Sequence, residues 1–297
     1  MHLTRRTAAV LGAVALACAG CATSDVRLAA PSGVGSSAAG AAHSSAASSG
    51  AGHASPSGSA TPTASPVPAA ATLPLAGKIV GIDPGHNGGN FDDAAYINTT
   101  IWNGMEDETC DTTGTQTASG YTEAQFNFNV ATDLQGDLVA DGASVVMTRH
   151  SNQGVGPCVT TRAQIINQAH ANVAIDIHAD GGPVSGRGFT VLEPVADGPN
   201  DQVIGASIAF GSDVRAAMLA DTPMPASDYY GQGGIIQRDD LAGLNLTTVP
   251  KILIECGNMP NPTDAGLLTS PQFQHVLAEA LTAAIVAFLT GQPIQTG

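Results

Sequence analysis

From residue 77 to the C-terminus, short apolar runs alternate with stretches in which apolar residues recur every three or four positions. The first pattern predicts buried strands and the second predicts helices. We expect strands over residues 77–83, 143–149, 172–180, 186–194 and 251–257. We expect helices over residues 122–142, 160–171, 200–220 and 271–291. This alternation predicts an α/β fold, a single domain whose mostly parallel twisted sheet is flanked by helices on both faces.

The first 21 residues follow a different pattern. Arg5 and Arg6 precede a short apolar run that ends in small residues, which is typical of a secretory signal peptide and too short for a membrane-spanning helix. Cys21 completes an Ala-Gly-Cys sequence that resembles a bacterial lipidation site, and Cys18 is a second candidate. We therefore expect a lipoprotein-type signal over residues 1–21, with simple cleavage or twin-arginine export as alternatives.

Residues 31 to 74 contain no acidic, basic (Lys or Arg) or aromatic residue and consist mostly of Ser, Ala, Gly, Pro and Thr. Such a segment buries too little apolar surface to offset the loss of backbone entropy on folding. We predict a disordered linker over residues 22–75 and a folded domain over residues 76–297. If Cys21 carries a lipid, this linker tethers the domain to a membrane.

Net charge argues against one class of partner, and the positions of the cysteines predict their chemical state. The chain has 25 acidic residues against 10 Lys and Arg, so it lacks the clustered positive charge that nucleic-acid binding requires. Cys110 and Cys158 lie in loop sequences rich in Gly and Thr, and in an exported protein we expect them to form a disulfide. Cys256 lies within an apolar strand and is expected to be a buried free thiol.

Four side chains of metal-ligating type are expected at one edge of the sheet, because ligands of open α/β sheets bind beyond the carboxyl ends of the strands. His86 follows the first predicted strand, and His178 and Glu255 lie at the ends of two later strands. Glu123 follows Thr122, the expected N-cap of the first long helix. Each residue alone has an ordinary structural explanation, but the four together predict a metal site.

Two His and one carboxylate are a common ligand set for catalytic zinc, which keeps an open position for water. A further carboxylate beside that water accepts its proton as a general base. The residue pattern alone does not decide whether Glu123 or Glu255 is the ligand. Asp83 and Asp180 are the last residues of two expected strands, and we interpret them as a loop residue and a turn residue, which argues against a second metal ion.

These residues lie in motifs that resemble those of the zinc-dependent N-acetylmuramoyl-L-alanine amidases of bacterial cell walls, particularly the short actinobacterial members. The motifs, which span nearly all of residues 77 to 290, are IVGIDPGHNGGN, GYTEAQFNFNVATDLQGDL, RAQIINQAHANVAIDIHADGG, SGRGF and VPKILIECGNMPNP. The resemblance implies a hydrolase that cleaves the amide between N-acetylmuramic acid and the L-Ala of the stem peptide. Its substrate would be peptidoglycan or muropeptides in the cell envelope, and we expect a monomer.

The resemblance also implies roles for single residues. His86, Glu123 and His178 match the zinc ligands, and Glu255 matches the catalytic glutamate. The short actinobacterial members similarly have two cysteines at the positions of Cys110 and Cys158. Three more polar side chains are candidates for substrate binding, with structural roles equally open: Arg162, Arg187 and Asn245.

The sequence departs from the family pattern without losing a ligand. Asn87 stands where many relatives have Gly, and Cys256 and Asn258 replace a commoner Thr-Gly-Phe run after the catalytic glutamate. Asp176 replaces a small polar residue two positions before His178, so it either orients that ligand or only adds charge. The rival hypotheses are a silent muropeptide-binding module and another zinc hydrolase, such as a peptidase or a phosphoesterase.

Overall fold

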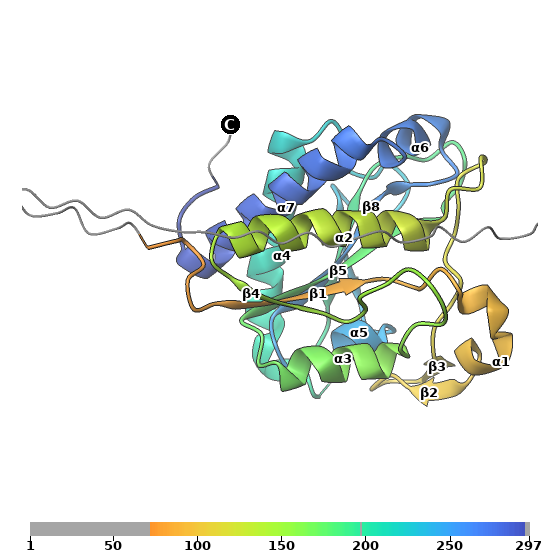
Figure 1. Ribbon diagram of the computed structural model, residues 1–297, viewed down its shortest axis with the longest axis horizontal. Coiled ribbons are helices and arrows are strands. Elements are labelled where there is room, and N and C mark those ends of the chain that lie inside the picture. Colours follow the sequence, from red (N-terminus) through yellow and green to blue (C-terminus); the bar gives the residue numbers. More distant parts are fainter. Residues whose placement is uncertain (1–71, 197, 295–297) are drawn as a thin grey trace, which may run out of the picture. The chain divides into compact units, whose positions relative to one another are not determined.

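Six strands form one sheet in the computed structural model, which describes residues 72–196 and 198–294 (Figure 1). Their order is β4-β1-β5-β8-β6-β7, and all neighbours run parallel except β6 and β8. The strands are β1 (Ile79–Pro84), β4 (Ser144–Met147), β5 (Val173–Asp180), β6 (Thr190–Pro194), β7 (Ile235–Arg238) and β8 (Lys251–Asn258). The expected fold class is confirmed.

Helices cover both faces of this sheet (Figure 1). One face packs against α2 (Glu123–Ala140), α4 (Ile204–Asp221) and α7 (Pro271–Thr290). The other lies under α3 (Val159–Gln168) and α5 (Ala242–Asn245). Helices α4 and α7 are long and apolar enough to cross a membrane, but they pack against each other and around the main core.

Smaller elements complete the described part of the chain. A two-stranded hairpin and short helices follow β1, and another helix follows β8. They are the 3-10 helix Asn90–Asp92, α1 (Ala94–Ile97), β2 (Thr100–Trp102), β3 (Asp107–Thr109), the 3-10 helix Asp201–Val203 and α6 (Pro262–Leu268).

The two faces of the sheet differ in polarity because side chains alternate along each strand. The face toward α2, α4 and α7 carries the main apolar core, which includes Ile82, Ile177 and Cys256. Cys256 is therefore a packing residue, as expected. The face toward α3 and α5 instead carries three buried charged side chains, those of Asp83, Asp176 and Lys251. The candidate site lies next to them.

Helix α2 has the boundaries that its sequence predicts. The Thr122 hydroxyl accepts a hydrogen bond from the backbone N–H of Gln125 at 3.3 Å, which caps the first turn. The helix ends at Ala140, and Gly142 takes the left-handed conformation with φ +95°. The cap places Glu123 at the first helical position, at the metal-site edge of the sheet.

Several expectations need correction. Asp83 and Asp180 belong to strands β1 and β5, not to a loop and a turn. Leu75, assigned to the linker, is fully buried, so the folded part begins before residue 76. The strand expected over residues 186–194 begins only at Thr190. Strand β7 and the short elements were not predicted, and the signal segment, with Cys18 and Cys21, lies outside the described residues.

Candidate metal centre

His86, Glu123 and His178 come together at the carboxyl edge of the sheet. One donor atom from each side chain lies within 4.8 Å of the other two. Glu123 Oε1 is central, at 3.2 Å from His86 Nε2 and 2.8 Å from His178 Nδ1. The two imidazole rings meet edge to face with their centroids 4.8 Å apart. The structure thus brings the three expected ligands together, although they lie on three separate elements.

Backbone conformation at the end of β1 makes this approach possible. His86 adopts a left-handed backbone with φ 57°, which is uncommon for a residue with a side chain and typical of functional sites. Gly85 precedes it, and a Cβ there would lie 2.2 Å from the His178 ring. A glycine is therefore required for β1 and β5 to bring both histidines to the same point.

The loop between β3 and α2, residues 110–122, lies against the three ligands. The backbone N–H of Thr115 donates to Glu123 Oε2 at 2.9 Å, and the Thr112 carbonyl lies 3.2 Å from His86 Nδ1. Gly114 has φ +69°, and a Cβ on it would lie 2.7 Å from both Glu123 Oε2 and His86 Cδ2. This loop fixes two of the ligands directly through its backbone.

Glu255 lies beside the three ligands. It is the register partner of His178 across β5 and β8, and both line one surface depression with Arg238 and Leu241. Its Oε2 atom is buried and has no hydrogen-bond partner among the described residues. Burial raises the pKa of Glu255 to about 8, and the Glu123 carboxylate adds to the shift. One oxygen of the Glu255 carboxyl group is thus buried and unpaired within the described residues.

The electrostatics of the three ligands suit a cation. Burial lowers the pKa of His86, but the Glu123 carboxylate outweighs it and raises that pKa to about 9. Burial likewise opposes protonation of His178, while Asp176 and Glu123 raise its pKa well above the usual value. Two imidazoles and one carboxylate are ligands that zinc prefers, so the donor set fits this ion.

Comparison with known proteins decides the family. A family model described as N-acetylmuramoyl-L-alanine amidase matches residues 80–287. The chain belongs to this amidase family. It is 39% identical over 218 residues to an N-acetylmuramoyl-L-alanine amidase of Mycobacterium tuberculosis, which covers 73% of this chain and 89% of that protein. A germination-specific N-acetylmuramoyl-L-alanine amidase of Bacillus subtilis is 25% identical over 231 residues, covering 73% of this chain and 81% of that protein.

Solved structures agree. The Ami1 amidase of Mycobacterium smegmatis has a TM-score of 0.69 at 39% identity and covers 73% of this chain and 99% of its own. The apo Ami1 of Mycobacterium abscessus has a TM-score of 0.68 at 38% identity and covers 72% and 100%. This chain is therefore an N-acetylmuramoyl-L-alanine amidase, a hydrolase with a metal-binding group formed by His86, Glu123 and His178.

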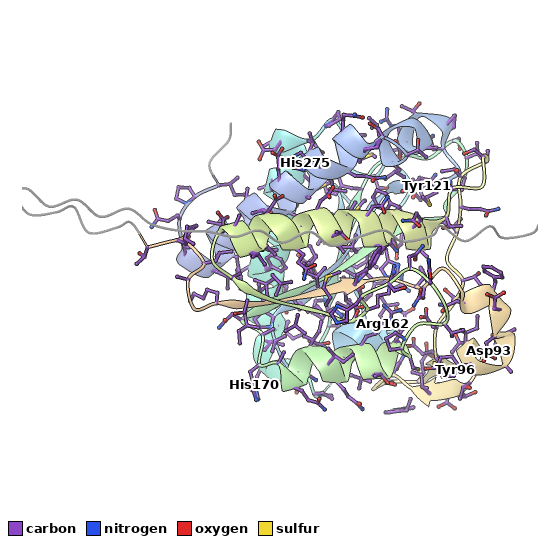
Figure 2. The ribbon with its side chains drawn as sticks, viewed as in Figure 1. Asp93, Tyr96, Tyr121, Arg162, His170 and His275 are labelled. Atoms are coloured by element: carbon purple, nitrogen blue, oxygen red, sulfur yellow. The ribbon has the colours of Figure 1, made fainter. Side chains whose placement is uncertain are left out.

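The three candidate substrate-binding residues of this amidase lie in positions that favour structural roles. Arg162 points from α3 toward the sheet (Figure 2), and all three of its guanidinium nitrogens are bound to protein acceptors. Asn245 is fully buried in α5 and donates to the Asp239 carbonyl. Arg187 pairs with Asp264 at 3.1 Å.

Three further charged residues lie near the centre, and of these only Asp176 was considered from the sequence. Arg238 lines the same depression as Glu255 and pairs with Asp240. Asp111 lies 3.4 Å from His86 Nδ1, and Asp176 lies 3.4 Å from His178 Nε2. The alternation that places Asp176 on the side of His178 was the only available signal, and it is consistent with this contact. Nothing local distinguished Asp111 or Arg238.

Among the described residues, His170, His275, Cys110 and Cys158 lie outside the group of metal ligands. His170 and His275 are exposed at the periphery (Figure 2). Cys110 and Cys158 are neighbours, because the backbone N–H of Val159 donates to the Cys110 carbonyl at 2.9 Å. Both are free thiols in the structure, so the expected disulfide is not formed there and stays a prediction.

Proposed function

We propose that this amidase uses one Zn²⁺ ion, held by His86, Glu123 and His178, with Glu255 as general base and general acid. The observation that carries this division of roles is the contrast between the two glutamates. Glu123 lies between the two imidazoles and accepts hydrogen bonds from backbone amides, whereas Glu255 Oε2 is buried without a partner. A ligand needs fixed partners, while a proton carrier needs a free oxygen.

Bound zinc would polarise the scissile carbonyl and make the attacking water more acidic. Glu255 would take a proton from this water while the water oxygen forms a bond to the lactyl carbonyl carbon. Glu255 would then deliver the proton to the nitrogen of L-Ala as the C–N bond breaks. The products are a free carboxyl group on N-acetylmuramic acid and a stem peptide with a free amino group. The elevated pKa of Glu255 suits a group that both accepts and returns a proton.

The proposed substrate is peptidoglycan or its muropeptide fragments, and the proposed location is the cell envelope. The family supports this, and the basic and apolar N-terminal sequence supports export. We propose a lipoprotein-type signal over residues 1–21, lipid attachment at Cys21, a linker that begins at residue 22 and ends before the buried Leu75, and a monomeric catalytic domain. An exported domain also suits a disulfide between the neighbouring Cys110 and Cys158.

Digestion of purified muropeptides tests the reaction. We expect release of intact stem peptides with a free L-Ala amino terminus, identified by mass, with loss of activity in chelator and recovery on addition of Zn²⁺. Cleavage between two amino acids would instead identify a peptidase. Retained binding without any zinc-dependent product would identify a silent recognition module.

A further inference from the structure

Five buried charged side chains form a connected network beneath the metal centre, on the sheet face covered by α3 and α5. None is more than 6% exposed, although they come from separate segments of the chain. Three are carboxylates and two are cations, so most of their charge is compensated within the network. They are Asp83, Asp111, Arg162, Asp176 and Lys251.

Asp83 joins the two cations of this network. Its Oδ1 atom lies 3.1 Å from Arg162 Nη1, and its Oδ2 atom lies 3.1 Å from Lys251 Nζ. A single carboxylate at the end of β1 therefore ties helix α3 to strand β8. Because each oxygen has its own cation, a shift of either cation would disturb the other.

The Arg162 arm of the network ends at one metal ligand. Arg162 Nη2 lies 3.2 Å from Asp111 Oδ2, and Asp111 Oδ1 lies 3.4 Å from His86 Nδ1. The other ring nitrogen of His86 faces Glu123. Asp111 thus lies on the outer side of the imidazole, away from the metal position.

The Lys251 arm ends at the other histidine ligand in the same manner. Lys251 Nζ lies 3.5 Å from Asp176 Oδ2, and Asp176 Oδ1 lies 3.4 Å from His178 Nε2. Among the described residues the buried Asp176 Oδ1 atom accepts no hydrogen bond, and His178 Nε2 faces it at 3.4 Å. Helix α5 covers the pair closely, because a Cβ on Gly243 would lie 3.1 Å from Asp176 Oδ2 and 3.4 Å from Lys251 Nζ.

We propose that Lys251, which contacts neither histidine, is a positioning residue of the metal centre. A neutral imidazole offers a lone pair at one nitrogen and a proton at the other. Asp176, held by Lys251, accepts the Nε2 proton of His178 and leaves Nδ1 free for the metal. Through Asp83 the same ammonium group also stabilises the Arg162 arm. This inference rests on the proposed zinc ligation.

The test measures Zn²⁺ affinity by chelator competition on folded full-length protein with Lys251→Met. Loss of a partner that orients a metal ligand lowers metal affinity by about 10–100-fold. We therefore expect the dissociation constant for Zn²⁺ to increase at least tenfold. Leu281→Ala is the matched control, because Leu281 is a fully buried α7 residue in the core on the opposite face. It should lower stability but change zinc affinity less than twofold. The visible spectrum of the Co²⁺-substituted Lys251 variant should also shift.

The outcomes separate the two proposals. If wild-type protein binds no zinc, the proposed function fails. If wild-type protein binds zinc and folded Lys251→Met binds it as tightly as Leu281→Ala does, only the positioning role is overturned. Should Lys251→Met fail to fold, Lys251→Gln takes its place, because it removes the positive charge, leaves Asp176 intact and keeps a polar side chain in the network. Zinc affinity at least tenfold below wild type in that variant supports the proposal, and wild-type affinity overturns it.

Discussion

His178 of β5 and Glu255 of β8 are register partners on neighbouring parallel strands, and the register shifts immediately beyond them. Partners of this kind project from the same face of a sheet, so Glu255 lies beside a metal ligand without being placed between the imidazoles. Glu123 reaches that central position from the start of a helix instead. The element that carries each glutamate thus supports the separate roles proposed for them.

Glu255→Gln should reduce turnover by at least about 10²–10⁴-fold, the contribution typical of general acid–base catalysis, while Zn²⁺ affinity stays near wild type. The amide keeps the shape of the side chain but cannot accept the proton. Glu123→Gln is the contrasting variant and should lose zinc. Steady-state kinetics and chelator competition on both proteins check the assignment. Loss of zinc in the Glu255 variant would reverse the two roles.

The same Glu255→Gln substitution should stabilise the metal-free protein at alkaline pH. The pKa of Glu255 is raised from 4.5 to about 8, so the folded state binds more protons than the unfolded state between these values. Stability attributable to this group therefore falls as the pH rises through that window. At pH 8–9 we expect the free energy of unfolding of the variant to exceed that of wild type by about 1–4 kcal/mol. This corresponds to roughly 1.4 kcal/mol per pKa unit, reduced by solvent screening. Urea unfolding at pH 4 and pH 9 measures this, and an equal difference at both would contradict it.

Zinc affinity should increase with pH at least up to about 9, the pKa of His86 in the folded protein. The histidine binds zinc only when neutral, so zinc must displace a proton below that pH. Zinc affinity rises with pH because His86, with its raised pKa, holds its proton more tightly than an ordinary histidine does. Titration calorimetry in two buffers of different ionisation enthalpy should show proton release at pH 7. Release of no protons there would contradict the shift.

The apolar pattern was sufficient to predict the fold class and most of the long elements, because burial dictates residue type along β1, β5, β8, α2 and α7. It did not predict β7, whose four residues follow a glycine pair at the sheet edge. Nor did it predict α5, a single turn. Short elements have too few positions for a periodicity to emerge, and tertiary contacts determine them.

The site was predictable to a similar extent. His86, His178 and Glu255 lie near the carboxyl ends of β1, β5 and β8, and parallel strands place these ends at one edge of the sheet. The partners of these residues were not predictable. Asp83 pairs with Lys251 across 168 sequence positions, and both are buried where an apolar pattern leads one to expect uncharged residues. A contact of that range depends on sheet order, which local spacing does not encode.

Gly114→Ala should weaken zinc binding by about tenfold or more, as expected when a ligand is displaced. The added methyl group would lie 2.7 Å from Glu123 Oε2 and from His86 Cδ2. Gly120→Ala is a matched control in the same loop, since Gly120 also has a positive φ, +85°, but no atom within 4 Å of its Cβ position. Both variants carry the backbone cost of about 1–2 kcal/mol, and only Gly114→Ala should lose zinc. Equal zinc affinity in the two would show that the loop does not fix the ligands.

Arg162→Met distinguishes a structural arginine from a substrate-binding one. Removing the guanidinium leaves Asp111 without its buried cation and Asp83 with Lys251 alone, so we expect a loss of about 3–5 kcal/mol in the free energy of unfolding. Arg187→Met is the comparison, because Arg187 is one-third exposed and its partner Asp264 also accepts two backbone N–H groups. That variant should lose no more than about 1–2 kcal/mol. Denaturant unfolding and KM for a soluble muropeptide are measured on both. A stable Arg162 variant with a raised KM would return Arg162 to the substrate-binding role.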